Sequence, residues 1–372
     1  MTQARIFVIG PFPPPVYGGA VITAAVADRL NSHDAVRRCD IAAGPMVGGL
    51  AYHLRRMRRV LAAAAAIAEN AGRRGTVYVA AAGGIGLIYN LALVAVARLL
   101  RQRLFVHHHS FAYLDRPTFV MRLLTRVAGG DAVHVALCRR MEALLRARYP
   151  AVLRTICVSN AAFYPPLASA SASTRQLVQP GGLRLGHMGN LTDEKGLDVV
   201  LDLYRDATAA GLAAQLVLAG PPADVHAAEE IAAAREAYGV GIDYRGPVYG
   251  ADKDRFFADI DVFLFPTRYA NEAEPTVLFE AMAHGVPVIA FGRGCIPEQL
   301  GDGASEASGG VVIPVDGSFV RRVGEVLRGW SAAPADFAAV QAGARARGAM
   351  LHAEGEAQLA GLLSALTGER AE

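Results

Sequence analysis

Two glutamates stand eight positions apart in the segment NEAEPTVLFEAMAHGVPVIA, residues 271–290, and both could bind hydroxyl groups. Glu280 falls in a predicted helix with apolar neighbours, so we expect its carboxylate to be partly buried. A buried carboxylate needs hydrogen-bond donors, and its two oxygens suit the vicinal hydroxyls of a sugar. Glu272 falls in the preceding loop, which follows the predicted strand DVFLFP.

The start of the helix that carries Glu280 could bind an anion. Pro275 lies near its first turn and Gly285 marks its end. The N–H groups of Thr276, Val277 and Leu278 are free to receive a diphosphate, because the first turn of a helix has no internal acceptors for them. Two surface glutamates on an ordinary helix are the alternative, which the apolar setting disfavours.

Two further segments carry groups that could bind phosphate. Lys195 follows the predicted strand LRLGHMG and is one of only two lysines in an arginine-rich chain. Its point charge suits a phosphate, although a solvated loop lysine explains the motif equally well. Gly18 and Gly19 open a helix after the strand RIFVIG, where backbone N–H groups can approach an anion closely. A tight turn without a ligand is the alternative, and the lack of G-x-G-x-x-G argues against a nicotinamide dinucleotide.

Three consecutive histidines end a predicted strand in RLFVHHHSF. On a strand, His107 and His109 face one way and His108 faces the other. The spaced Cys and His ligands that zinc requires are missing from the sequence. Because ligands bind at the carboxyl ends of parallel strands, we favour His109 as a site residue, with His107 as the fallback. Buried core histidines are the alternative for the other two.

Short apolar runs alternate with helical stretches in both halves of the chain. Continuous apolar strands predict parallel sheets that are covered on both faces. The predicted fold class is α/β, with two Rossmann-like doubly wound domains that face a cleft. The boundaries are an N-terminal domain at 1–165, a Pro/Ser/Ala-rich linker at 166–182, a C-terminal domain at 183–335, and helices at 336–372 that pack back toward the N-terminal domain.

Charge is distributed unevenly along the chain. Residues 1–165 hold 21 arginines and 7 acidic residues, a net charge of +14, whereas residues 166–372 carry a net −11. Arginines beside aliphatic residues in YHLRRMRRVL, RLLRQR and RRMEALLRARY suit an anionic membrane surface or a lipid-diphosphate acceptor. Solvated helix faces explain the pattern equally well. No nucleic-acid recognition motif accompanies the charge, so we do not expect a nucleic-acid partner.

One uncharged segment, residues 77–97, is long enough to span a membrane. Its Gly-Gly step and small residues favour a buried strand, a turn and a helix instead. The N-terminus lacks a basic region followed by an apolar one, so we expect no secretory signal. These features predict a cytoplasmic protein, with peripheral attachment at the inner face of the plasma membrane as an extension of that prediction.

With these motifs in place, the chain resembles glycosyltransferase family 4, the group 1 glycosyltransferases of the GT-B fold. The resemblance covers nearly the whole chain and rests on the Gly-Gly loop, the central histidine, Lys-Gly after the linker, the E-x7-E pair, EAMAHGVPVIA and GCIPE. It implies that Glu272 binds the donor sugar and that Glu280 binds the ribose. It further implies a diphosphate clamp at Lys195, a donor-phosphate contact at Gly18 and Gly19, and a contact of His109 with the transferred sugar.

The resemblance implies a retaining, hexosyltransferase-type enzyme that moves a sugar from a nucleotide-diphosphate-sugar to a saccharide or lipid-linked acceptor. Cell-surface polysaccharide or glycolipid synthesis is the implied role, and no cofactor and no D-x-D metal motif is expected. One departure concerns Asn190, which replaces an arginine usual in the family, and Arg268 could supply the missing charge. The alternatives are a GT-B sugar-nucleotide epimerase or hydrolase, and a non-catalytic sugar-nucleotide-binding partner protein.

Overall fold

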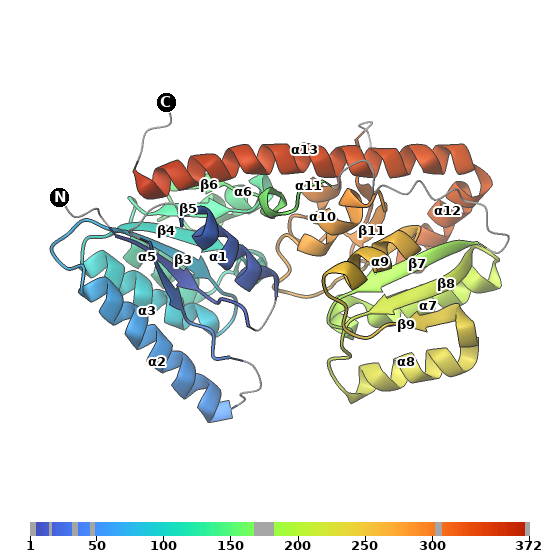
Figure 1. Ribbon diagram of the computed structural model, residues 1–372, viewed down its shortest axis with the longest axis horizontal. Coiled ribbons are helices and arrows are strands. Elements are labelled where there is room, and N and C mark those ends of the chain that lie inside the picture. The colour runs from blue at the N-terminus through green and yellow to red at the C-terminus, as the bar shows by residue number, and fades with distance from the viewer. Residues whose placement is uncertain are drawn as a thin grey trace. The chain divides into compact units, whose positions relative to one another are not determined.

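The structure is a computed structural model that describes residues 5–14, 17–31, 36–44, 49–166, 182–301 and 307–368. It comprises two compact units (Figure 1). The first contains Met1–Phe163 and Glu354–Glu372, and the second contains Tyr164–Ala353. Most of the predicted linker, residues 167–181, lies outside the described residues.

The first unit is built on a parallel six-stranded sheet. Its strands are β1 (Ile6–Gly10), β2 (Val36–Asp40), β3 (Thr76–Ala81), β4 (Arg103–His108), β5 (Val133–Ala136) and β6 (Arg154–Cys157). The spatial order β2-β1-β3-β4-β5-β6 places the reversal of strand order between β1 and β3, which pair in parallel. Ligands of doubly wound sheets bind at the carboxyl ends of the strands beside such a reversal.

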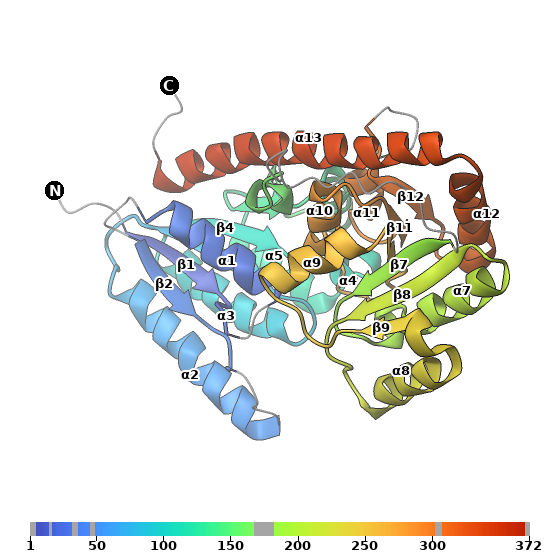
Figure 2. The ribbon, with the colours of Figure 1, turned by 45° about the vertical axis from the view of Figure 1, so that its right-hand side comes forward.

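Helices cover both faces of this sheet. They are α1 (Gly18–Arg29), α2 (Gly49–Ala68), α3 (Gly86–Leu99), α4 (Ala112–Asp115), α5 (Phe119–Ala128), α6 (Arg139–Arg148) and the 3-10 turn η1 (Asn160–Phe163). Val26 of α1 and Leu359 and Leu362 of α13 (Pro334–Thr367) share one buried core with strand residues such as Val8. On the opposite face α2, α3 and α5 lie along the sheet (Figures 1 and 2).

The second unit repeats this architecture with another parallel six-stranded sheet. Its strands are β7 (Leu183–Met188), β8 (Ala213–Ala219), β9 (Ile242–Tyr244), β10 (Val262–Phe265), β11 (Val288–Phe291) and β12 (Gly310–Ile313). The order β12-β11-β10-β7-β8-β9 puts its reversal between β7 and β10. These two strands pair directly, with Phe263 opposite Gly186, so the loops that follow them leave the sheet side by side.

The helical elements of the second unit sort onto two faces of its sheet. They are η3 (Asp193–Lys195), α7 (Leu197–Ala209), α8 (Val225–Tyr238), η4 (Gly239–Gly241), α9 (Ala251–Asp259), α10 (Thr276–Ala283), α11 (Ile296–Leu300), α12 (Phe319–Ala332) and α13 up to Ala353. Leu264 of β10 faces a core shared with α7, α8 and α12. Phe256 and Phe257 of α9 pack edge-on against Phe263 of the same strand. Phe263 and Leu264 thus face opposite sides of β10, and both are apolar because the strand is buried on both faces.

The fold-class prediction of two doubly wound parallel α/β sheets is confirmed. The uncharged segment 77–97 forms most of β3, a turn and most of α3, and none of the described helices is long and apolar enough to cross a membrane. The sequence reading did not identify β2, whose residues Val-Arg-Arg-Cys-Asp are polar because it is an edge strand. It also passed over β5 and β6, which have four residues each.

Candidate functional site

Lys195 lies in a tight turn at the carboxyl end of β7. The Thr192 hydroxyl accepts a hydrogen bond from the Lys195 backbone N–H at 3.1 Å, which fixes the 3-10 turn η3. Gly196 follows with φ of +92°, and a Cβ there would lie 2.4 Å from the Pro266 carbonyl oxygen. Only glycine fits this left-handed and crowded position. Gly196 therefore lets the Lys195 turn pack directly against the chain that leaves β10.

Lys195 and Glu272 form an ion pair at these adjoining strand ends. The Lys195 Nζ atom lies 2.5 Å from Glu272 Oε2, and the two side chains are 22% and 11% exposed. The hydroxyl of the buried Thr267 donates to the same Oε2 atom at 3.3 Å. The ammonium also lies 4.5 Å from the centre of the Tyr269 ring, which favours a cation. A cation and a carboxylate are thus held together where a doubly wound sheet binds its ligand.

The loop that carries Glu272 is held by the turn at the start of the GCIPE segment. Gly294 adopts φ of +57°, and a Cβ at this position would lie 2.7 Å from the Glu272 carbonyl oxygen. The Cys295 N–H donates to the Ala273 carbonyl at 2.7 Å. The Arg293 guanidinium donates to the carbonyls of Tyr269 and Ala270 at 3.1 and 2.6 Å. These contacts give GCIPE a positioning role beneath the glutamate loop.

Glu280 is paired with the second lysine of the chain. The Lys253 Nζ atom donates to Glu280 Oε1 at 2.6 Å, and it is equally close to Oε2 without hydrogen-bond geometry. Oε2 is a buried acceptor with no hydrogen-bond partner among the described residues. Burial raises the pKa of Glu280, and Lys253 opposes that shift. The carboxylate, predicted to be partly buried, is 20% exposed.

The first turn of α10 offers backbone donors between the two glutamates. Within the described part of the chain, the N–H groups of Thr276 and Val277 have no acceptor. The third expected donor is different, because the Leu278 N–H donates to the Pro275 carbonyl at 3.3 Å. The prediction of three free N–H groups is therefore wrong for Leu278, since the helix starts with a 3-10 type bond. The phenol of Tyr164 is hydrogen-bonded to the Thr276 side chain, and burial raises the pKa of Tyr164 to about 12.

Asn190 stands where the family usually has an arginine, and Arg268 is the residue predicted to supply the missing charge. Asn190 is exposed in the loop after β7. The Arg268 guanidinium donates to both carboxylate oxygens of Asp198 at 2.7 and 2.8 Å and to the Asp193 carbonyl at 2.5 Å. Its charge is therefore already balanced by Asp198 in this structure. A contact of Arg268 with a donor stays a prediction.

Gly18 and Gly19 begin α1 in the first unit, as predicted, after the extended residue Tyr17. Across the described residues, no acceptor is found for the N–H groups of these two glycines, whereas the N–H groups of Ala20 and Val21 donate to the Tyr17 carbonyl. The pair could therefore bind an anion through two open donors.

The three histidines of β4 and the residue after it alternate as the strand period predicts. His107 and His109 lie together with ring centroids 4.2 Å apart, while His108 points to the other face. There, His108 Nε2 lies 2.9 Å from His134 Nδ1, and His108 Nδ1 lies 2.9 Å from the Tyr113 hydroxyl. Burial lowers the pKa of His109 and of His134 to about 4. These imidazoles are neutral at physiological pH.

His107 and His109 differ in how far they are buried. His107 is fully buried and its Nδ1 is hydrogen-bonded to the Tyr78 hydroxyl at 2.5 Å, which suits a core role. His109 is partly exposed. The Nε2 atoms of both residues are buried and have no hydrogen-bond partner among the residues described, so the two differ in exposure and not in this atom. This difference agrees with the preference for His109, whose contact with a substrate stays a prediction.

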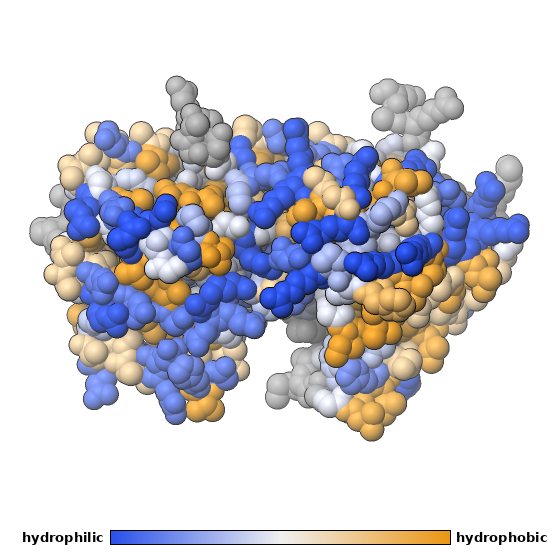
Figure 3. Space-filling model, turned by 180° about the vertical axis from the view of Figure 1, so that it is seen from behind, coloured by the Kyte–Doolittle hydropathy of each residue, from blue (hydrophilic) through white to orange (hydrophobic). Residues whose placement is uncertain are grey.

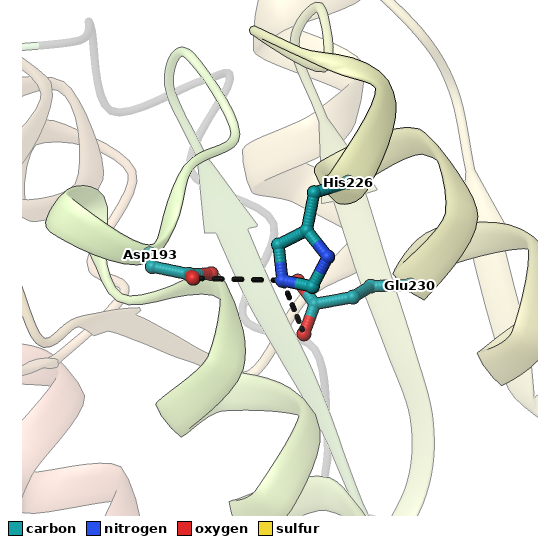
Figure 4. Close-up of side chains that lie close together, drawn as sticks. All are labelled: Asp193, His226 and Glu230. Atoms are coloured by element: carbon teal, nitrogen blue, oxygen red, sulfur yellow. Dashed lines mark ion pairs between the residues drawn. The ribbon is translucent and has the colours of Figure 1, made fainter.

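Among the described residues, one group of side chains has the spacing to hold a metal ion. Asp193 of η3 faces His226 and Glu230 of α8, and their ligand atoms lie within 4.8 Å of one another (Figure 4). The His226 Nε2 atom is 3.7 Å from each carboxylate. Burial raises the pKa of Glu230, and the adjacent Asp193 carboxylate adds to the shift. A divalent cation could bind here, two positions from Lys195, although the group also serves as a contact between η3 and α8.

The expectation that the sequence lacks a D-x-D triplet is wrong, because residues 252–254 and 259–261 have this form. Asp252 and Asp254 lie on α9 and pair with Arg255 and His284. Asp259 pairs with Arg245 at 2.8 Å, and Asp261 accepts from the Arg184 backbone N–H. The second triplet precedes β10, so it lies at the opposite end of the strand from Lys195 and Glu272.

Sequence reasoning missed four contributors to this site. Lys253 pairs with Glu280, and Tyr269 and Thr267 contact the Lys195–Glu272 pair. His187 of β7 joins the two central strands, because its Nδ1 lies 2.9 Å from the Leu264 carbonyl of β10. Lys253 had a detectable signal, since it is the other of two lysines in the chain. Nothing in the sequence distinguishes the remaining three from ordinary loop and core residues.

Comparison with protein families supports the resemblance in the second unit. Residues 182–328 match the model of the family described as Glycosyl transferases group 1. This range contains Lys195, Lys253, Glu272 and Glu280, which the structure arranges in two ion pairs. Comparison with curated proteins found no significant match.

Several solved structures resemble the whole chain. HepE of Anabaena in complex with UDP has a TM-score of 0.72 and 16% sequence identity, over 97% of this chain and all of HepE. Sucrose-phosphate synthase from Thermosynechococcus elongatus has a TM-score of 0.72 and 16% identity, over 98% of this chain and all of that chain. The UDP-forming α,α-trehalose-phosphate synthase from Burkholderia vietnamiensis has a TM-score of 0.67 and 12% identity, over 99% of each chain. These likenesses establish the fold, which is of the GT-B type.

Proposed function

We propose that the protein is a retaining glycosyltransferase of family 4 that transfers a sugar from a nucleotide-diphosphate-sugar to a saccharide or lipid-linked acceptor. The observation that carries the proposal is the Lys195–Glu272 pair at the carboxyl ends of β7 and β10. The pair combines a cation that can bind a phosphate with a carboxylate that can bind a sugar. Glu272 lies four residues before Thr276, where the N–H groups without an acceptor begin. The family match over residues 182–328 includes all of these groups.

In this proposal, binding of the donor opens the ion pair between Lys195 and Glu272 and gives each side chain a new partner. The 2.5 Å contact leaves no room for a ligand atom between them, so the donor diphosphate takes up the ammonium and a sugar hydroxyl donates to the carboxylate. As the glycosidic bond breaks, negative charge grows on the leaving diphosphate and positive charge on the sugar. Lys195 and the N–H groups of Thr276 and Val277 stabilise the first, and Glu272 orients the sugar.

Glu280 would bind the ribose of the donor. Its two carboxylate oxygens accept from the vicinal hydroxyls when Lys253 shifts away. Gly18 and Gly19 would contact the donor phosphate, and His109 would contact the transferred sugar as a neutral imidazole. We further propose that the reaction needs no metal ion, because lysine and backbone donors stabilise the leaving group.

The acceptor and cellular role belong to the same proposal. A lipid-diphosphate acceptor suits the net positive charge of residues 1–165, and cell-surface polysaccharide or glycolipid synthesis would use a lipid-linked or saccharide acceptor. We propose a cytoplasmic enzyme that attaches peripherally to the membrane.

Calorimetric titration with nucleotide-sugars tests the donor assignment. UDP-glucose is the first candidate, because the similar HepE of Anabaena was solved in complex with it. ADP- and GDP-sugars serve as comparisons. Saturable binding of one nucleotide-sugar by the wild type, lost in Glu280→Ala, would support the proposal. Failure of every nucleotide-sugar to bind the folded protein would refute it.

Turnover assays then separate the proposed transferase from its alternatives. Sugar transfer that requires added lipid-linked saccharide would support a transferase. Conversion of the donor without an acceptor would identify an epimerase or hydrolase. Donor binding with no turnover in either assay would favour a non-catalytic binding protein, for which Asn190 is the sequence hint.

A further inference from the structure

A pocket between α5 and α6 of the first unit is lined by three arginines. Arg122 and Arg126 belong to α5, and Arg148 is the last residue of α6. The pocket has a volume of about 330 Å³, which is enough for a small ligand. The other described residues that line it are uncharged, Thr125 and Tyr149 among them. A cavity of this size, with only positive charges in its walls, suits a small anion.

Local structure brings the three guanidiniums to one place. Arg122 and Arg126 are four residues apart and therefore lie on one face of α5. At the end of α6, the Tyr149 hydroxyl donates to the Tyr113 carbonyl at 2.5 Å, which fixes the wall from which Arg148 extends. Burial raises the pKa of Tyr149, whereas Arg122 and Arg148 oppose the shift because both cations lie close to the phenol. Both helices thus direct positive charge toward the same buried ring.

The charges of this pocket are not balanced by carboxylates. None of the three guanidiniums has an ion-pair partner in the described part of the chain. Arg148 donates to the main-chain carbonyl of Asp115 at 3.3 Å, which holds its side chain without cancelling its charge. Glu142 of α6 pairs with Arg146 instead, and Asp131 pairs with an arginine of α3. Figure 3 shows strongly hydrophilic side chains over the side of the first unit that carries α5, in the right half of the view. The pocket is therefore open to an external anion.

The pocket lies toward the amino ends of β5 and β6. Arg126 comes seven residues before β5 begins, and Arg148 comes six residues before β6 begins. Ligands of a doubly wound sheet bind at the opposite, carboxyl ends of the strands. Gly18 and Gly19 follow the carboxyl end of β1, and His109 follows that of β4. The arginine pocket is therefore separate from the candidate site residues of this unit.

We propose that Arg122, Arg126 and Arg148 form a binding site for a small soluble anion that carries a diphosphate group. A guanidinium presents paired N–H donors that match two phosphate oxygens. A single phosphate carries about −1.5 to −2 charges near neutral pH, so a diphosphate balances three guanidiniums more closely. The hydroxyls of Thr125 and Tyr149 already donate to main-chain carbonyls, which leaves the arginines as the donors for the anion. A bilayer surface fits less well, because the charges converge on a cavity of small-molecule size.

This site goes beyond the proposed transfer reaction, because it requires neither donor nor acceptor. Calorimetric titration of the whole protein with inorganic diphosphate tests it. The wild type and Lys195→Ala are titrated in parallel, because Lys195 could bind the same anion in the second unit. We expect saturable binding by both proteins. Adding Arg122→Gln/Arg126→Gln to Lys195→Ala should weaken this binding at least about tenfold, because two charge-assisted contacts are lost.

Matched variants separate the pocket from net charge and from misfolding. Arg55→Gln/Arg58→Gln removes two exposed arginines from α2 of the same unit and should bind diphosphate like its parent protein. Arg148→Lys keeps the charge but loses the planar fork, so its affinity should be intermediate. Arg122 and Arg126 make no side-chain hydrogen bond or ion pair among the residues described, so their replacement should leave the melting temperature unchanged.

Four results would overturn the proposal. They are absence of diphosphate binding by the wild type, undiminished binding after Arg122→Gln/Arg126→Gln, an equal loss in the α2 control, and loss of all binding in Lys195→Ala, which would assign the anion to the second unit. Binding to phosphatidylglycerol vesicles through these arginines, without binding of diphosphate, would also refute it and assign the arginines to a lipid surface. Diphosphate binding at the pocket of a protein that binds no nucleotide-sugar would sustain this inference while refuting the proposed function.

Discussion

Both units place pairs of polar groups on or beside their central strands, but they use different chemistry. In the second unit, Lys195 and Glu272 are a charged pair, and Lys253 and Glu280 form another. In the first unit, His108 and His134 are neutral and hydrogen-bonded to each other. Burial lowers the pKa of His134 to about 4, whereas the lysine–glutamate pairs retain partial access to solvent.

This difference indicates which groups can exchange partners with a ligand. A partly exposed ion pair can open at a small cost, since its members remain hydrated or bind ligand atoms of opposite character. Buried neutral imidazoles lose a hydrogen bond that nothing replaces, so they stay together. The lysine–glutamate pairs therefore suit ligand binding, while the His108–His134 contact suits a rigid scaffold for the partly exposed His109.

Removing Glu272 should have the largest effect on activity. We expect Glu272→Ala to lower kcat by about a thousandfold, because the transferred sugar loses an orienting carboxylate. Its melting temperature should change little, since the partner Lys195 can reach water. Initial rates of sugar transfer measure this effect. Glu325→Gln, which replaces an exposed glutamate of α12, is the control, and near-normal transfer by Glu272→Ala would contradict the site assignment.

The two lysines should differ in the step that they affect. Lys195→Ala should lower kcat/KM by roughly a hundredfold, because it removes the cation at the leaving diphosphate. Lys253→Ala should change kcat little, because in the proposed function Glu280 contacts the ribose and not the reacting atoms. Steady-state kinetics with varied donor concentration separate the two effects. Equal losses of kcat in both variants would show that the division into phosphate and ribose sites is wrong.

Acid should weaken the first unit through its buried histidines. The pKa of His134 is about 4 in the folded protein and ordinarily about 6.5, so the folded state disfavours the protonated form. Its contribution to stability is complete above pH 6.5 and falls by about 3 kcal/mol as the pH approaches 4. Urea unfolding at several pH values measures this loss. His134→Asn, which keeps a hydrogen-bonding group near the Nδ1 position, should flatten the dependence, and an unchanged slope would contradict it.

Glu280 should show the opposite pH dependence. Its raised pKa means that the folded state favours the protonated carboxyl, so its contribution to stability is lost as the pH rises through that pKa. Glu280→Gln should therefore raise the melting temperature by about 2 °C at pH 8, with a smaller gain at acid pH. Donor binding should weaken in the same variant. A melting temperature lowered at pH 8 would show that the Lys253 pair outweighs the burial of the carboxylate.

Arg268 should have the smallest effect of the charged residues near Lys195. Because Asp198 already balances its charge, we expect Arg268→Ala to raise the donor KM by no more than about threefold. A loss comparable to that of Lys195→Ala would show that Arg268 leaves Asp198 and takes over the position of the cation that Asn190 lacks.

The sequence predicted the fold well, because the fold depends on local patterns. Continuous apolar strands indicated two parallel sheets, and Pro275 and Gly285 bounded α10 to within a residue or two. The pairing of each lysine with one glutamate could not be predicted in this way. Lys195 and Glu272 lie 77 positions apart, and their contact depends on the pairing of β7 with β10.

The exposed side chains of Leu50, Leu54, Met57 and Leu61 on α2 show a second limit of sequence patterns. Its leucines have the spacing of a core-facing stripe, and periodicity alone cannot show which side of a helix meets the sheet. The structure buries the smaller residues Val60 and Ala63 instead and leaves Leu54 and Leu61 exposed.

The first turn of α10 shows a third limit. The N–H groups of Thr276 and Val277 lack an acceptor, as the general rule for helix starts predicts, but the hydrogen bond from the Leu278 N–H to the Pro275 carbonyl depends on the local geometry of the turn.

The scarcity of lysine gives this chain a built-in reporter. Since its two side-chain amines both lie beside the glutamates of the site, reductive methylation with isotopically enriched formaldehyde would place side-chain labels at Lys195 and Lys253 alone. Each labelled amine would give its own resonance, and titration of a nucleotide-sugar would show which one loses its carboxylate contact first.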